Sequence, residues 1–445
     1  MKTRPFFGVE DPANITTVLL GGFQHVLAMF VGIVTPPLLI SCSLGLDPGS
    51  TGFLISMALF TSGLTTFIQV KRFGPFGSGL LSVQGTSFTF VSLSIQAGQA
   101  GGLPLIFGMT MAAAPVEMIL SRFIHFARRL FPPVVTGSVV MLIGTSLIKV
   151  GVTDLGGGSG DPGFGSPSNL LLGMFVMAVI IILNRFGRGF LSTVSIALGI
   201  VAGYLLAALL GRVDFSPFAE AGWLTVPQPL KFGIDFDPRY LLPWVIGYLI
   251  TTIESIGDLT ASSGVSREPV EGPVFIRRLE GGILSDGMGS LLAGFFNAMP
   301  NTTFSQNNGV IGLTGVASRR VGYGVAGILI LLGLFPRIAA LISVMPKPVL
   351  GGATTIMFAM VAVAGLKIIV SGGLGIRNQF ILAITLAAGL GIEMVPGAFA
   401  KIGGTPVEAG ILLGSLSAIL RSGLAVGAIV ATVLNLLLPR DTGTG

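Results

Sequence analysis

The chain has 445 residues, of which 51% are hydrophobic and only 10% are charged, whereas soluble domains carry about a quarter. This composition excludes a water-soluble globule and a disordered chain, and one cysteine with two histidines excludes a disulfide framework and predicts no metal or other cofactor. The net charge of +6 in so apolar a chain indicates basic loops at a membrane face rather than nucleic-acid binding. We therefore predict an all-α polytopic membrane protein in the lipid bilayer.

Fourteen hydrophobic segments are predicted to be membrane spans, since a spanning helix needs about 20 mostly apolar residues. The third and tenth are weak, because they are short or rich in Gly, Ser, Thr and Asn. A further apolar stretch, 407–420, is expected at the membrane interface. In chain order the segments centre on 16–34, 51–69, 79–97, 103–122, 133–150, 169–185, 191–210, 240–262, 280–298, 303–315, 321–343, 349–369, 378–396 and 422–438.

Basic residues are concentrated in alternate loops, and Lys and Arg favour the cytoplasmic side. The stretches 43–50 and 151–168 contain none, and the loop 211–239, Lys347 and Lys401 are exceptions to the alternation. The pattern predicts a multi-pass protein of the cytoplasmic membrane with both termini in the cytoplasm. The basic positions that carry it are Lys2, Arg4, Lys71, Arg72, Arg128, Arg129, Arg185, Arg188, Arg267, Arg277, Arg278, Arg319, Arg320 and Arg377.

A repeated motif divides the chain into two halves. Pro133 and Pro348 each begin a Pro-Val-x-x-Gly motif, 215 residues apart, at the start of the fifth and twelfth segments. Seven spans separate the copies, so the second copy would be inverted in the membrane, as in many transporters whose substrate site lies where broken helices meet. The two weak segments occupy equivalent places in the halves, which supports the repeat.

Five carboxylates fall within the predicted spans, where a charge is costly and usually faces a cavity or a partner. Glu254 and Asp258 are four residues apart, so they share one helix face. A carboxylate that takes up a proton inside the membrane is what a proton-coupled carrier requires, and the alternative is a helix end with solvated acids. Asp286 is the third, whereas Glu117 and Glu393 lie near prolines and are expected at the interface.

The tenth segment contains three consecutive amide side chains, Gln306, Asn307 and Asn308, which is rare in a membrane span. Amides carry both donors and acceptors, which suits a neutral polar heterocycle better than a bare ion. The third segment, 82–88, has a similar pattern. Each is expected to be a short strand that turns into a half-helix whose free N–H groups face a ligand; the alternative is an extracellular loop.

These residues resemble the nucleobase–ascorbate transporter family, the nucleobase:cation symporters, over nearly the whole chain. The family signature is Gln/Glu/Pro, Asn, any residue, Gly, four of any residue, Thr, then Arg/Lys/Gly, and residues 306–315 fit each fixed position. Residues 254–258 resemble the family's carboxylate segment, 22–30 its Gln-His motif, and 84–88 its third span.

The resemblance implies seven plus seven inverted spans in two domains. The core domain would comprise 1–129 (spans 1–4) and 240–343 (spans 8–11). The gate domain would comprise 130–239 (spans 5–7) and 344–445 (spans 12–14). Family members often form homodimers through the gate domain.

The resemblance also implies residue roles at a substrate site between the domains. Glu254 would accept hydrogen bonds from ring N–H groups of a nucleobase, and Gln306 would bind another edge. Protonation of a set that includes Glu254 would couple transport to protons, and His25 is either a member of that set or a structural histidine. The other implied site residues are Ser87, Phe88, Ser305 and Asn307 for the substrate, and Asp258 and Asp286 for the proton.

The resemblance further implies a purine substrate. Gln306 resembles the purine members, which take xanthine or urate, whereas uracil members more often have Glu at this position. Ser87 stands where xanthine-selective relatives often carry Asn, so a smaller side chain could admit the 8-oxo group of urate. Gly312 stands where close bacterial purine relatives often have a larger polar residue, which also argues against narrow xanthine selectivity.

We therefore predict a bacterial proton-coupled symporter, and not an enzyme, that imports xanthine, urate or both across the inner membrane by alternating access. A uracil or broad nucleobase permease is one alternative. A same-fold carrier of sulfate or bicarbonate is another, which the adjacent Glu254 and Asp258 disfavour. A membrane enzyme is disfavoured because the chain lacks a metal cluster, a nucleophile elbow and a P-loop lysine.

Overall fold

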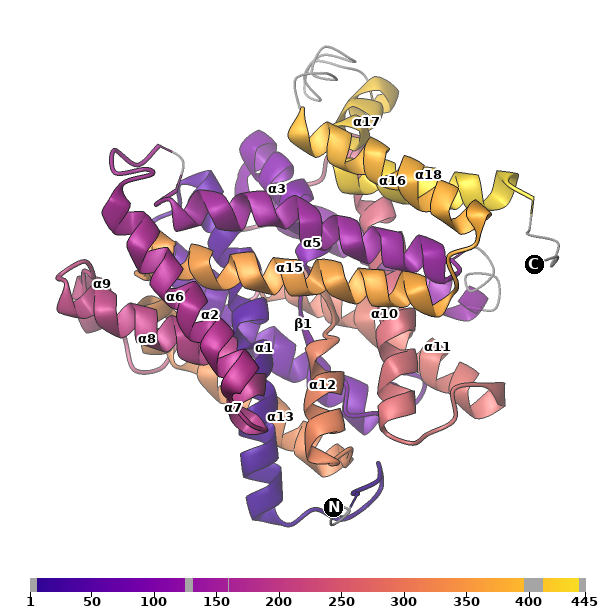
Figure 1. The fold of residues 1–445 in the computed structure, drawn as a ribbon, viewed down its shortest axis with the longest axis horizontal. Coiled ribbons are helices and arrows are strands. Elements are labelled where there is room, and N and C mark those ends of the chain that lie inside the picture. Colours follow the sequence, from indigo (N-terminus) through magenta and orange to yellow (C-terminus); the bar gives the residue numbers. More distant parts are fainter. Residues whose placement is uncertain (1–5, 125–130, 159, 396–410, 440–445) are drawn as a thin grey trace.

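The computed structural model describes residues 6–124, 131–158, 160–395 and 411–439, and these are mostly helical (Figure 1). The all-α membrane class is therefore confirmed. The helices are α1 (Ile15–Leu44), α2 (Pro48–Lys71), η1 (Phe88–Phe90), α3 (Val91–Leu120), η2 (Ser121–Phe123), α5 (Pro133–Leu155), α6 (Pro167–Phe186), α7 (Phe190–Thr193), α8 (Ser195–Leu209), α9 (Ser216–Glu220), α10 (Pro238–Val265), α11 (Gly272–Phe295), α12 (Gln306–Thr314), α13 (Arg319–Leu334), α14 (Pro336–Ser343), α15 (Lys347–Ser371), α16 (Ile376–Met394), α17 (Ile411–Leu420) and α18 (Gly423–Leu437); the strands are β1 (Gln84–Thr86) and β2 (Asn301–Thr303).

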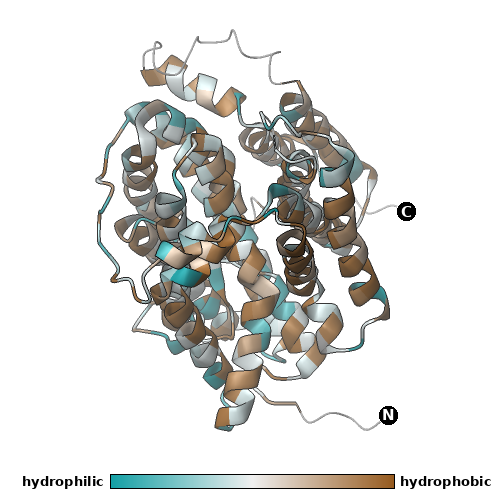
Figure 2. Ribbon diagram, turned by 90° about the vertical axis from the view of Figure 1, so that its left-hand side faces the viewer, coloured by the Kyte–Doolittle hydropathy of each residue, from teal (hydrophilic) through white to brown (hydrophobic). Residues whose placement is uncertain are grey.

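Seven of the described helices are long and apolar enough to cross a membrane, or up to nine if each bent pair is one span. Apolar residues run along most of the helices (Figure 2). The predicted count of fourteen is not confirmed. One reason is that the predicted third segment contains β1, η1 and only the start of α3, and that α3 breaks at Gly101 and Gly102 (Gly102 has φ +68°) before it continues through the predicted fourth segment. Another is that α12 has only nine residues. Of the predicted interfacial stretch 407–420, residues 411–420 form α17, and 407–410 lie outside the described residues, as do Lys401, Arg128 and Arg129.

The two weak segments meet in the middle of the molecule as a two-stranded antiparallel sheet. β1 pairs with β2 in the register Gln84↔Thr303 and Thr86↔Asn301. Each strand is followed by a helix, η1 and α3 after β1, and α12 after β2. The strand pair uses backbone N–H and C=O groups that a broken helix would otherwise leave unsatisfied in the membrane.

The helices that carry the repeated Pro-Val-x-x-Gly motif, α5 and α15, pack side by side and run in opposite directions (Figure 1). Glycines spaced by seven residues on α5 form the contact. A Cβ on Gly137 would lie 2.6 Å from the Gly365 carbonyl oxygen, and one on Gly144 would lie 2.3 Å from the Ala362 nitrogen. The absence of side chains allows the two backbones to touch, as small residues do between membrane helices.

We expect Gly144→Ala to lower the thermal stability of the protein by about 1–3 kcal/mol, because the added methyl must displace the α15 backbone. Gly391→Ala is the matched control, since a Cβ on Gly391 of α16 meets nothing within 4 Å. Thermal unfolding in detergent measures both variants. Equal midpoints for the two would show that the α5–α15 contact adapts without cost.

The connection between α8 and α10 lies over segments from distant parts of the chain. Its backbone N–H groups donate from Thr225 to the Leu334 carbonyl at 2.9 Å, from Leu230 to the Phe295 carbonyl at 2.9 Å, and from residue 235 to the carbonyl of residue 104 at 2.9 Å. All three acceptors belong to segments that the sequence assigns to the core domain, so this connection is tied to them rather than left as a free loop.

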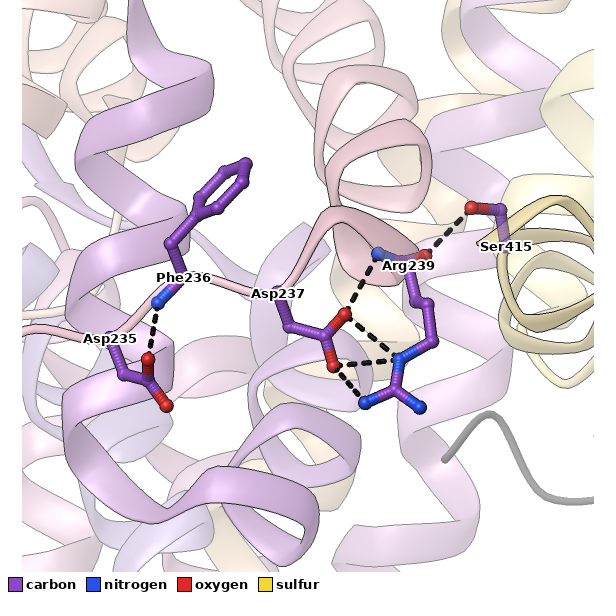
Figure 3. A network of polar contacts seen from close by, with 5 residues as sticks. All are labelled: Asp235, Phe236, Asp237, Arg239 and Ser415. Atoms are coloured by element: carbon purple, nitrogen blue, oxygen red, sulfur yellow. Dashed lines mark hydrogen bonds and ion pairs between the residues drawn. The ribbon is translucent and has the colours of Figure 1, made fainter. Parts of the chain in front are cut away.

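A polar network fixes the start of α10 (Figure 3). Asp237 caps the helix by accepting from the Arg239 backbone N–H at 2.9 Å, and it also forms an ion pair with the Arg239 guanidinium at 2.6 Å. These hydrogen bonds from Arg239 hold the pKa of Asp237 below its usual value. Ser415 Oγ of α17 donates to the Arg239 carbonyl at 2.9 Å. The helix that carries Glu254 is thereby anchored at its N-terminal end.

A candidate substrate site at the broken helices

The strand pair brings the two half-helices to one place beside α10. Backbone bonds extend the sheet on both sides: Ser87 donates to the Pro300 carbonyl at 2.8 Å, and Phe304 donates to the Val83 carbonyl at 3.1 Å. Thr66 of α2 accepts the Gln84 N–H at 2.9 Å. η1, β2 and α12 all contact α10. The structure therefore holds the starts of both half-helices against the helix that carries Glu254 and Asp258.

The three consecutive amides at the start of α12 lie in different environments. Asn307 is fully buried and donates from Nδ2 to the Leu81 carbonyl. Asn308 is bound to α10, because its Oδ1 accepts from Ser262 Oγ at 2.6 Å. The Gln306 amide is half-buried, and none of the described residues forms a hydrogen bond with it. Of the three amides, the one without an internal partner is therefore Gln306.

The first turns of α12 expose little side-chain volume on one side, although Leu313 further along is 44% exposed. Ser305, which precedes the helix, is exposed and forms no side-chain cap bond. Gly309 and Gly312 are exposed too, and a Cβ at either would meet nothing within 4 Å. These three residues lie on one side of the helix at spacings of four and three. A planar ligand could therefore approach the helix backbone closely here.

Two of the three carboxylates predicted for the site have internal hydrogen-bond donors. Asp258 Oδ2 accepts from Thr303 Oγ1 of β2 at 3.0 Å, and Asp286 of α11 accepts from Ser255 Oγ. Glu254, one turn before Asp258, is half-buried, and no described residue donates a hydrogen bond to it. The ion pairs of the described residues involve none of the three. The Glu254 carboxylate therefore keeps all its acceptor positions for a ligand.

Glu117 was placed wrongly by the sequence, which put it at the membrane interface. It is fully buried in α3, and its Oε1 accepts from Thr251 Oγ1 at 3.0 Å and from Thr252 Oγ1 at 3.4 Å, both on α10. The interfacial position was inferred from the nearby Pro115, but α3 continues beyond this proline and Glu117 is buried inside the protein. Glu117 lies within electrostatic reach of Asp286 and Glu254, so it joins the carboxylates of the site.

His25 is also part of this polar centre. It is 1% exposed on α1, and its side chain lies beside Asn307. The Phe304 ring fills the space between α1 and β1, since a Cβ on Gly32 or Gly85 would come within 2.4 Å or 2.3 Å of it. His25 therefore lies next to the motif residue Asn307 of α12.

Ser87 and Phe88 begin the other half-helix. Ser87 is buried, and its hydroxyl accepts the Thr89 N–H at 3.3 Å. Phe88 packs edge-to-face on Phe358 of α15, with ring centroids 5.3 Å apart. Phe88 also lines a cavity of about 540 Å³ between α3, α5, α16 and α18, which Glu393 of α16 lines too. Phe88 therefore lies between the start of the half-helix and the helices α5 and α15.

The fold is similar to that of solved multi-pass membrane proteins. The transmembrane domain of a cyanobacterial bicarbonate transporter, BicA, aligns over 97% of this chain and 99% of its own, with a TM-score of 0.59 and 15% identity. Murine Slc26a9, an anion transporter in the inward-facing state, aligns over 95% of this chain and 68% of its own, with a TM-score of 0.64 and 10% identity. At these identities the likeness shows the fold alone, which these transporters build with inverted repeats.

The sequence then identifies the family. The model described as the Permease family matches residues 16–398, and the chain belongs to this family, the nucleobase–ascorbate transporters. It is thus a permease and not an enzyme. The chain is 44% identical to the xanthine permease XanP of Escherichia coli over 98% of its length and 95% of the relative's. It is 39% identical to the xanthine permease XanQ of the same organism (97% and 93%) and 40% identical to a putative purine permease of Clostridium perfringens (97% and 92%).

Proposed function

We propose that this protein is a symporter that imports a purine nucleobase, xanthine or urate, together with a proton across the bacterial inner membrane. The observation that carries the proposal is that one carboxylate and one amide, Glu254 of α10 and Gln306 of α12, lie on two helices in contact and have no hydrogen-bond partner among the described residues. A purine presents ring N–H donors and carbonyl acceptors, which these two groups complement. Relatives at 44% and 39% identity that are xanthine permeases support the same substrate class.

The other site residues serve three tasks in this proposal. Ser87, Phe88 and Ser305 bound the space for the base, with Phe88 beneath it and main-chain groups at Ser305 in reach. Asn307 maintains the geometry of the motif through Leu81. Protons enter through the carboxylate set, in which Asp258 and Asp286 act with Glu254, and His25 either belongs to that set or supports it structurally.

Transport in this proposal follows from two domains that move relative to each other. The core domain comprises 1–129 and 240–343 and carries both half-helices, and the gate domain comprises 130–239 and 344–445. The antiparallel pairing of β1 with β2 and of α5 with α15 supports a 7+7 inverted repeat of fourteen spans with both termini in the cytoplasm. Protonation outside would load the base, and proton loss inside would release it.

Parallel uptake of labelled xanthine and labelled urate into expressing cells, with and without a protonophore, tests the function. Uptake of either purine that collapses with the protonophore is the expected result. Uptake that is unchanged by the protonophore would show that the transport is not coupled to protons. No uptake of either, with the protein confirmed in the membrane, would refute purine import, and uracil and sulfate would then be tested as substrates.

We expect Ser87→Asn to lower urate uptake severalfold relative to xanthine uptake, because the larger amide would fill the space that the 8-oxo group needs. Asn is also a favoured cap residue, so the bond that Ser87 accepts from Thr89 has a replacement. Ser87→Ala is the control that removes the hydroxyl without adding volume. If both variants change the urate-to-xanthine ratio equally, side-chain volume at this position does not set the preference.

A further inference from the structure

A small basic pocket lies at one end of the helix bundle, apart from the substrate site. Its volume is about 140 Å³, and residues from the end of α2, from η2 and from the first half of α11 line it. The lining includes three arginines, Arg72, Arg122 and Arg277, with Ser121 and the single carboxylate Glu280. Three elements far apart in the sequence thus contribute arginines to the lining of one pocket.

None of these three arginines forms an ion pair with another residue that the structure describes. Ion pairs among the described residues use Arg239, Arg278 and Arg319, and none involves Arg72, Arg122 or Arg277. Arginine presents a planar fork of donors that matches phosphate oxygens. With one carboxylate against three guanidinium groups, the pocket has a net positive charge and suits an anion with several oxygens.

Exposed apolar side chains lie next to these arginines. Ile119 (59% exposed) precedes Arg122 by three residues, and Val274 (44% exposed) precedes Arg277 by three, so each pair shares a helix face. Phe123 (58% exposed) follows Arg122 directly. On a membrane-spanning protein, exposed apolar residues of this kind face acyl chains, and arginines at the end of a span lie at headgroup level.

We propose that this pocket binds the phosphate of an anionic phospholipid whose acyl chains lie against Ile119, Phe123 and Val274. A pocket of basic residues between membrane helices is suited to such headgroups. The apolar surface favours a phospholipid over free phosphate, because a soluble anion would gain nothing from it. The proposal rests on the membrane class of the protein and is independent of the transported substrate.

Binding of phosphatidylglycerol to the purified protein in phosphatidylcholine nanodiscs, measured by native mass spectrometry, tests the proposal. Arg122→Gln with Arg277→Gln should weaken binding about 30-fold, since each basic residue near a headgroup contributes about 1 kcal/mol, which is about fivefold. The control with equal charge loss is Arg185→Gln with Arg188→Gln, two exposed arginines outside the pocket, which should leave binding within twofold. Equal weakening in both variants, or none in either, would overturn the site.

Two further arms keep the test decisive if the double variant folds poorly. Glu280→Gln should strengthen phosphatidylglycerol binding severalfold, because it removes the one negative charge in the pocket, whereas Glu271→Gln, an exposed carboxylate outside the lining, should not. Millimolar inorganic phosphate should fail to displace the lipid. Displacement by phosphate alone, or an equal gain in both glutamine variants, would overturn the phospholipid assignment.

Discussion

Glu254→Gln is expected to reduce purine affinity roughly 100-fold, since each hydrogen bond to a charged group contributes about 1.5–3 kcal/mol and the carboxylate accepts from ring N–H groups. The amide keeps the size of the side chain and loses the charge and one acceptor position. Because no described residue bonds to Glu254, the substitution breaks no internal contact, and thermal stability without substrate should be retained. Equilibrium binding of labelled xanthine to the purified protein measures the effect.

Asp258→Asn is the comparison that separates a substrate ligand from a structural carboxylate. Asp258 already accepts from Thr303 at 3.0 Å, so its amide variant should retain purine binding within about tenfold while losing stability. If Glu254→Gln binds xanthine within twofold of the original protein, the assigned site is wrong. If Asp258→Asn is the more severe of the two for binding, the roles of the two carboxylates are exchanged.

Gln306→Ala is expected to abolish measurable purine binding while leaving the thermal midpoint nearly unchanged. Its amide has no partner among the described residues, so removing it costs the folded protein little, whereas a bound base loses both a donor and an acceptor. Binding of labelled xanthine and thermal unfolding are measured on the same preparation.

Asn308→Ala is the matched control, because it removes another amide side chain two residues further along the chain. This side chain accepts from Ser262 at 2.6 Å and donates to the Asp258 carbonyl at 3.3 Å. Its removal leaves buried groups without partners and should destabilise the protein by about 1–3 kcal/mol. A stable Asn308→Ala variant without binding, together with a Gln306→Ala variant that binds normally, would show that the wrong amide has been assigned to the substrate.

Part of the candidate site could be predicted from the sequence alone. The family signature at 306–315 and the spacing of Glu254 and Asp258 predicted which residues form the site, because both are local patterns along the chain. The sequence could not say which amide is free, since Asn307 and Asn308 find their partners on the segment before β1 and on α10. Such partners are distant in sequence, and local patterns carry no information about them.

The burial of Glu117 is a second feature that the local sequence did not predict. The proline two residues before it suggested a position at the membrane interface, but the carboxylate is buried and accepts hydrogen bonds from Thr251 and Thr252 of α10. The connection between α8 and α10 is another case, since its backbone bonds to Leu334 and Phe295 were not foreseen.

By itself the sequence determined the membrane class, the family and the two segments that interrupt the helices, because hydropathy, motif and composition are properties of short stretches of chain. The tertiary structure decided which polar groups are used up inside the protein and which stay available. Polar groups inside a membrane protein are costly without a partner, and the partners of Asn307 and Asn308 lie on other elements. Which groups stay available, Glu254 and Gln306 among them, therefore becomes visible only when all the packing partners are in place.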